Sequence, residues 1–206
     1  MLGGQSRKAL RPDTARHIGL GTSNLDTDIS SITSGRLINI QIVPGHQNPV
    51  DQYTLSNPVD VAQLAMKFGV ELPGQLLREI NNDLQLELST IQLYEDTMPT
   101  LQILKERGFK IALCSNLAMP YGEQLRKLLP DFLDAVVFSY EVGAIKPEHQ
   151  IYKVIQAHFG CDFPEMLFIG DHPILDVETP ISLGMKARLI ERHKNQRLLD
   201  VMGDLI

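Results

Sequence analysis

Several polar side chains in the second half of the chain are of types that can bind and activate a phosphate ester. Ser115 and Asn116 end an apolar run, Lys146 precedes a proline, and Asp171 and Asp176 follow another apolar run. A lysine ammonium, a serine hydroxyl and backbone N–H groups can stabilise phosphoryl oxygens. Carboxylate oxygens are ligands suited to Mg²⁺. Phosphoryl transfer needs such groups together with a nucleophile.

Each of these residues also has a structural interpretation when it is taken alone. Ser115 and Asn116 suit a strand end and a helix cap, and Lys146 suits a solvated loop. Asp171 and Asp176 suit a turn and a helix N-cap, because glycine and proline lie among them and a helix is expected next. Their order along the chain favours the chemical interpretation over the separate structural ones.

The segments around these residues alternate between two hydrophobic periodicities, which is typical of βαβ units. Helices are expected at 98–107, 121–130, 147–160 and 176–184, and strands at 109–116, 134–140, 165–171 and 185–190. Such an order predicts an α/β fold with a parallel sheet covered by helices on both faces. Ligands of these sheets bind at the carboxyl ends of the strands, where Ser115 and Asp171 are expected.

The first half has a different pattern. Two amphipathic helices are expected within 57–93, which we interpret as a small all-helical cap between an N-terminal part of the core, 1–56, and the main core, 94–206. Before the cap, 35–49 contains apolar residues at Leu37, Ile38, Ile40, Ile42 and Val43 and ends on turn residues. This stretch is expected to be a strand or one arm of a hairpin.

Composition excludes several classes of protein. The formal net charge of −6, with 43% apolar and 21% charged residues, argues against a nucleic-acid partner. Cys114 and Cys161 are the only cysteines, which favours a reduced, cytoplasmic compartment over a disulfide scaffold. No apolar run is long enough for a membrane span, and the basic start lacks the apolar region of a secretory signal, although its arginines leave organelle targeting as an alternative.

Three ordered motifs resemble those of the haloacid dehalogenase (HAD) superfamily of hydrolases. "LCSN", ending at Asn116, is similar to its second motif, and "GAIKPEHQIY", around Lys146, to its third. "LFIGDHPILDVETPISLGMKA", with Asp171 and Asp176, is similar to its fourth. The three motifs lie within 94–190, in the βαβ context that the superfamily requires.

The resemblance implies a Rossmann-like core and a role for each motif residue. Ser115 and Lys146 would bind the transferring phosphoryl group, with Asn116 beside them, while Asp171 would ligate Mg²⁺ and Asp176 would support that site. The helical insertion would correspond to the cap that one large subgroup of the superfamily carries between its first and second motifs. Such caps close over the site and select the substrate.

The first motif of the superfamily is Asp-x-Asp after an apolar strand, and Asp26 and Asp28 form the only such pair in this chain. The resemblance implies that Asp26 is the nucleophile, that Asp28 is the general acid and base, and that Asp26 and the Asp28 carbonyl also hold Mg²⁺. The stretch "SGRLINIQ" downstream is similar to the flap hairpin of the superfamily. Ile29 and Ser30 stand where Gly-Thr is usual, and the stretch is also consistent with a polar loop.

The predicted function is therefore a Mg²⁺-dependent phosphomonoesterase that acts on a small phosphorylated metabolite, as a monomer or homodimer. The alternative is a catalytically degenerate family member with a binding or regulatory role, for which the unusual first motif is the evidence. Halide displacement by the same aspartate would leave the pair Asp171 and Asp176 unexplained, because that chemistry needs no metal.

Overall fold

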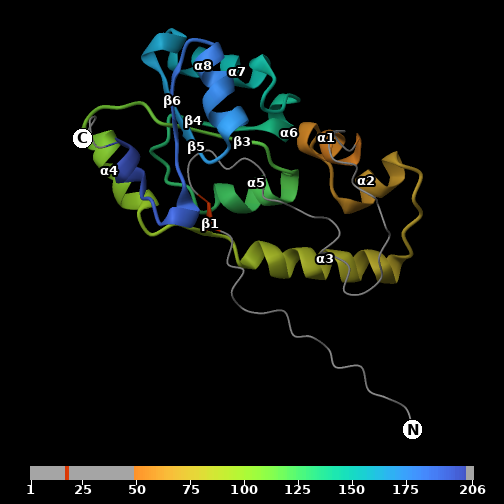
Figure 1. The fold of residues 1–206 in the computed structure, drawn as a ribbon. Helices are drawn as coiled ribbons and strands as arrows, with labels where there is room; N and C mark the ends of the chain where they lie inside the picture. The colour runs from red at the N-terminus through yellow and green to blue at the C-terminus, as the bar shows by residue number, and fades with distance from the viewer. Residues whose placement is uncertain (1–16, 19–48, 203–206) are drawn as a thin grey trace.

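The computed structural model describes residues 17–18 and 49–202 (Figure 1). Asp26 and Asp28, as well as the stretch expected to be a strand or flap hairpin at 35–49, apart from Pro49, lie outside the described residues. None of the helices in the described ranges has the length and apolar composition needed to cross a membrane.

All strand pairs among the described residues are parallel. The pairs are β3 (Ala112–Ser115) with β4 (Ala135–Phe138), β5 (Leu167–Gly170) with β6 (Lys186–Leu189), and β1 (His17–Ile18) with β2 (Gln92–Leu93). Ser115 lies opposite Phe138, and Gly170 lies opposite Leu189. The two strands of each pair therefore have their carboxyl ends side by side. The described residues thus form three two-stranded parallel sheets.

Helices and turns lie between these strands and after the last of them. They are α4 (Thr97–Glu106), α5 (Met119–Arg126), α6 (Ser139–Val142), α7 (His149–Phe159), a π-helix η3 (Pro173–Glu178), α8 (Thr179–Ser182), α9 (Leu198–Met202), and the 3₁₀ turns η2 (Phe163–Glu165) and η4 (Arg192–Lys194). Helix α7 ends on Gly160, whose φ of 63° is a left-handed conformation that favours glycine.

Side chains of successive strand residues pack on opposite faces. Cys114 and Phe168 belong to a buried cluster with Ile151 and Ile155 of α7. On the other side, Ile169 packs with Leu101 and Leu104 of α4 and with Leu198 and Met202 of α9, and Leu113 packs with Leu125 of α5, in two further buried clusters. Helices therefore cover both faces of the parallel strands, which confirms the predicted α/β class.

The N-terminal part of the described chain is helical: α1 (Pro49–Ser56), α2 (Val61–Lys67) and α3 (Gly74–Ser89) lie together to one side of the strands in Figure 1. Helix α2 begins with a capping box, in which the Asp60 side chain accepts the Gln63 N–H and the Gln63 side chain accepts the Asp60 N–H. Leu84 and Leu88 of α3 pack in the cluster that contains Leu125. The helical segment begins at Pro49, before the predicted cap boundary at 57, and the short strand β2 follows it.

Two predicted helices differ from the observed ones. Helix α5 ends at Arg126 rather than at Pro130, because Lys127 and Leu128 donate to carbonyls three residues back and tighten the last turn. An α-helix was predicted at 176–184, and this prediction was wrong for the first residues. There the chain forms the π-helix η3 as far as Glu178, and only Thr179–Ser182 is α-helical.

Candidate active site

The predicted phosphate-binding residues lie where two strands end. Ser115 is the last residue of β3 and is fully buried, and Asn116 follows it, also buried. Asp171 follows the last residue of β5 and is exposed. Lys146, in the loop between α6 and α7, contacts residues from both of these regions. The strands thus present Ser115 and Asp171 at their carboxyl ends, and Lys146 links the two regions.

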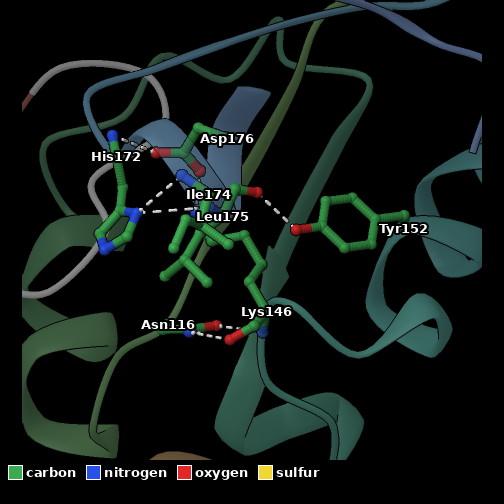
Figure 2. Close-up of polar contacts among 7 residues, drawn as sticks. All are labelled: Asn116, Lys146, Tyr152, His172, Ile174, Leu175 and Asp176. Carbon is green, nitrogen blue, oxygen red and sulfur yellow. Dashed lines mark hydrogen bonds and ion pairs between the residues drawn. The ribbon is translucent and has the colours of Figure 1, made fainter. Parts of the chain in front are cut away.

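Lys146 and Asp176 form a buried ion pair (Figure 2). Lys146 Nζ lies 2.6 Å from Asp176 Oδ1, and neither side chain is exposed. Burying two charges is costly, so each must be compensated by the other and by hydrogen bonds. The Lys146 ammonium also lies 5.6 Å from the centre of the Phe168 ring. This pair joins the loop before α7 to the turn after β5.

Asn116 positions the backbone of Lys146. Its Nδ2 donates to the Lys146 carbonyl at 3.0 Å, and its Oδ1 accepts the Lys146 N–H at 2.8 Å. Figure 2 shows this pair of contacts below the lysine side chain. A side-chain amide that satisfies one residue's N–H and C=O fixes the position of that peptide. The Asn116 side chain therefore holds the Lys146 backbone beside the end of β3.

Asp176 reaches back to the end of β5 because the π-helix turns the chain. Its Oδ2 accepts the His172 N–H at 3.0 Å. His172 Nδ1 accepts the N–H groups of Ile174 and Leu175 at 3.2 and 3.3 Å, and the Tyr152 hydroxyl donates to the Leu175 carbonyl at 2.5 Å. His172, not Asp176, is thus the N-cap of this turn.

Gly170 provides the space that Asp176 occupies. A Cβ at Gly170 would lie 2.3 Å from Asp176 Cγ and 2.4 Å from its Oδ2. These distances are shorter than any tolerable contact, so a side chain at position 170 would displace the carboxylate. The glycine of "GDHPILD" is therefore required by the packing of the aspartate six residues later.

Ser139 is a polar residue of this region that the sequence analysis missed. It begins α6 directly after β4 and is fully buried. Its Oγ accepts the Leu117 N–H at 3.1 Å and donates to the Leu117 carbonyl at 3.4 Å. Its place at the end of an apolar run was the available signal, the same one that identified Ser115.

A second network, also missed, joins the segment before α4 to the segment after β6. The Arg192 guanidinium donates to both carboxylate oxygens of Asp96 at 2.9 Å, and the Leu198 N–H donates to Asp96 at 2.6 Å. Asp96 stands at the N-cap position of α4, but its carboxylate makes no capping hydrogen bond, because Arg192 and Leu198 donate to it.

Tyr94 contacts this network through Arg192. The Arg192 guanidinium carbon is 4.2 Å from the centre of the Tyr94 ring. Burial raises the pKa of Tyr94 above 10.0, the charge of Arg192 opposes this, and the charge of Asp171 adds to it. Arg192 and Asp171 thus both influence the pKa of the same phenol.

The described residues contain no group of three or more His, Cys, Asp or Glu side chains that could hold a metal ion. Asp171 offers an exposed carboxylate of the type that Mg²⁺ prefers, whereas both oxygens of Asp176 accept hydrogen bonds from Lys146 and His172. Within the described ranges, Asp171 is the predicted ligand that is open to solvent.

A family model for haloacid dehalogenase-like hydrolases matches residues 39–184. The chain belongs to this family. The match includes Ser115, Lys146, Asp171 and Asp176 with their surrounding elements, and it begins after Asp26 and Asp28.

Two relatives of this chain are named as a phosphatase and a pyrophosphatase. The chain is 35% identical over 105 residues to the glyceraldehyde 3-phosphate phosphatase of Methanopyrus kandleri, covering 50% of this chain and 45% of that one. It is 31% identical over 141 residues to the pyrophosphatase PpaX of Bacillus cereus, covering 63% and 64%. The chain thus spans less than two thirds of the length of these relatives.

Solved structures have the same fold. A HAD phosphatase from Thermococcus onnurineus superposes with a TM-score of 0.54 at 27% identity, covering 71% of this chain and 68% of that one. A HAD family enzyme from Bacteroides thetaiotaomicron, solved as a magnesium complex, superposes with a TM-score of 0.55 at 17% identity, covering 70% and 75%. The second likeness concerns the fold alone.

Proposed function

We propose that this protein is a Mg²⁺-dependent phosphomonoesterase that acts on a small phosphorylated metabolite. The observation that carries the proposal is the position of Lys146, a buried cation held by Asn116 and Asp176 between the ends of β3 and β5. Asn116 holds the Lys146 backbone and Asp176 holds its ammonium, which keeps this cation at the ends of both strands. The relatives named as phosphatases support the same class of reaction.

Phosphate binding is assigned to Ser115, Asn116 and Lys146. The Ser115 hydroxyl and the Asn116 backbone N–H are neutral donors, and the Lys146 ammonium supplies a positive charge. These groups stabilise the phosphoryl oxygens as charge spreads over them in the transition state. Asp176 keeps the ammonium of Lys146 in place.

Asp26 is proposed as the nucleophile and Asp28 as the acid and base. Ile18 pairs with Leu93, next to Tyr94, and Tyr94 is within electrostatic range of Asp171. Asp26 is eight residues beyond Ile18, and eight residues can span at most about 28 Å. This reach is consistent with a carboxylate delivered to the ends of β3 and β5.

The proposed reaction has two displacements. The Asp26 carboxylate attacks phosphorus, the P–O ester bond breaks, and Asp28 donates a proton to the leaving alkoxide. Asp28 then accepts a proton from water, which attacks the aspartyl-phosphate and releases Asp26 and inorganic phosphate. Asp171, Asp26 and the Asp28 carbonyl would hold Mg²⁺, with Asp176 supporting the site. The cation would neutralise phosphate charge that otherwise repels the carboxylate.

Substrate selection is assigned to the helical segment. We propose that 57–93 is a cap over the core formed by 94–206, with 1–56 completing that core, and that the protein is a cytoplasmic monomer or homodimer. The net charge of −6 agrees with a small-molecule substrate rather than a polyanion.

Hydrolysis of para-nitrophenyl phosphate with Mg²⁺ or with EDTA tests the proposal. We expect turnover that requires Mg²⁺ and is abolished in Asp26→Asn and Asp171→Asn. Asp131→Asn, a change at an exposed aspartate, is the matched control and should retain full activity. Turnover that persists in Asp26→Asn would show that another group attacks phosphorus.

One observation favours a second candidate, a phosphate-binding protein without turnover. The family match begins at residue 39 and leaves out Asp26 and Asp28. Calorimetric titration with inorganic phosphate separates the two candidates. Phosphate binding by the wild type, with no hydrolysis of any phosphate ester, would favour the binding protein.

A further inference from the structure

The π-helix η3 leaves one backbone carbonyl without a partner from its own hydrogen-bond series. Hydrogen bonds of a π-helix join residues five apart, whereas those of an α-helix join residues four apart. At the end of η3, the Thr179 N–H donates to the Ile174 carbonyl, five residues back. The next bond of this series would join the Leu175 carbonyl to the N–H of residue 180. That residue is Pro180, which has no N–H.

The Tyr152 hydroxyl supplies the partner for this carbonyl (Figure 2). It donates to the Leu175 carbonyl at 2.5 Å, and the tyrosine, which belongs to α7, is fully buried. Burial raises the pKa of Tyr152 well above its ordinary value of 10.0, so the hydroxyl keeps its proton. It therefore remains a donor at every pH at which the protein is expected to work.

Two residues of one segment hold two consecutive residues of this turn. Lys146 binds the Asp176 carboxylate, and Tyr152, six residues after the lysine, binds the Leu175 carbonyl. The ring of Phe168 contacts both of them: its centre lies 5.6 Å from the centre of the Tyr152 ring and 5.6 Å from Lys146 Nζ. The segment that enters α7 therefore fixes the turn after β5 at two adjacent points.

An α-helical turn is the alternative conformation for this segment. In that turn the Thr179 N–H would leave the Ile174 carbonyl and donate to the Leu175 carbonyl, four residues back. The Leu175 carbonyl would then have a partner without Tyr152. The change of hydrogen-bond series would also change the direction of the Asp176 side chain, because the number of residues in the turn differs. The contact with Tyr152 thus favours the π-helical turn.

We propose that Tyr152 is a positioning residue of the active site, which holds the Leu175 carbonyl and so keeps η3 in the π-helical turn that brings Asp176 to Lys146. Its effect on catalysis rests on the proposed function, in which Lys146 binds the phosphoryl group. Tyr152 acts through Asp176 and Lys146 rather than through contact with the substrate.

Removal of the hydroxyl in two backgrounds tests the proposal. Tyr152→Phe is made in the wild type and in Pro180→Ala. In the second background, residue 180 has an N–H that can donate to the Leu175 carbonyl within the π-helical series, so the hydroxyl should no longer be needed. Tyr140→Phe is the matched control, because Tyr140 is also buried and its hydroxyl donates one hydrogen bond, to Glu141 at 3.2 Å.

Hydrolysis of para-nitrophenyl phosphate is measured at a temperature at which every variant is folded. In the wild-type background we expect Tyr152→Phe to lower kcat about tenfold, because a displaced catalytic group stabilises the transition state less well. In the Pro180→Ala background the same change should lower kcat less than about twofold, and the control should retain full activity. A purely structural role for Tyr152 does not predict this rescue. Equal losses in the two backgrounds, or no loss in either, would overturn the proposal.

Unfolding in urea measures the same contact without turnover. Tyr152→Phe should lower the urea midpoint in the wild-type background and much less in Pro180→Ala, because a buried carbonyl without a partner is costly. Equal shifts in the two backgrounds would overturn the proposal. Absence of hydrolysis by the wild type, with a difference between the backgrounds in urea, would contradict the proposed function and still support the role of Tyr152 in holding the turn.

Discussion

The ammonium of Lys146 and the carboxylate of Asp176 are 2.6 Å apart, and both side chains are completely buried. Thirty residues separate them in the sequence. Together with the contacts of Asn116 to the Lys146 backbone, this pair connects the end of β3, the loop before α7 and the turn after β5. The core of the candidate site is therefore held by charge and hydrogen bonds as well as by apolar packing.

Removing one member of this pair should destabilise the fold strongly. We expect Lys146→Met and Asp176→Leu each to lower the free energy of unfolding by about 3–5 kcal/mol, because each leaves a buried charge without its partner. The double variant should lose less than the sum of the two. Urea unfolding of all four proteins gives the coupling, and additive losses would contradict a direct interaction.

Gly170→Ala should displace Asp176. The added methyl group would meet the carboxylate at 2.3–2.4 Å, so we expect a loss of about 1–3 kcal/mol in the free energy of unfolding. Gly74→Ala is the control, because its Cβ would lie 3.6 Å from Arg78 Nη1 at the start of α3 and meet no obstacle. Equal melting temperatures for the two variants would show that Asp176 can move away freely.

The contacts of Asp96 predict a dependence of stability on pH. Burial alone would raise the pKa of Asp96, but the Leu198 N–H and the Arg192 guanidinium outweigh it and hold the pKa below the ordinary value of 3.8. A carboxyl group with a lowered pKa in the folded state stabilises the fold above its unfolded pKa, and this contribution is lost as pH falls through the folded value.

Unfolding in urea between pH 6 and pH 2.5 measures this contribution. Wild type should lose more stability than Asp96→Asn as pH falls below about 4, since Asn lacks the titrating group. The two proteins should therefore differ most near neutral pH. A constant difference across the whole range would show that the charge of Asp96 contributes nothing.

The two cysteines should react at different rates. Burial raises the pKa of the Cys114 thiol to about 11, and only 4% of the residue is exposed. Thiolates are the reactive form, so iodoacetamide at pH 8 should modify the half-buried Cys161 and leave Cys114 intact. Mass spectrometry of digested protein measures both sites, and equal labelling in the native state would mean that Cys114 is accessible.

The sequence by itself determined the elements of the core and the residues at their ends. Alternating and helical periodicities place Ser115 at the end of one strand and Asp171 after another, because hydrophobic spacing reports which face of an element is buried. The same pattern predicted the α/β class, and the three ordered motifs predicted the family to which the chain belongs.

Only the tertiary structure decided which of these residues touch. Asp96 stands at the N-cap position of α4, but its carboxylate binds Arg192 and Leu198, about a hundred residues away. Asp176 looked like one more carboxylate of a metal site, and the π-helix turns it onto Lys146 and against Gly170. Local spacing encodes the direction of a side chain, whereas a buried charge takes the partner that the packing of distant elements brings within hydrogen-bond reach.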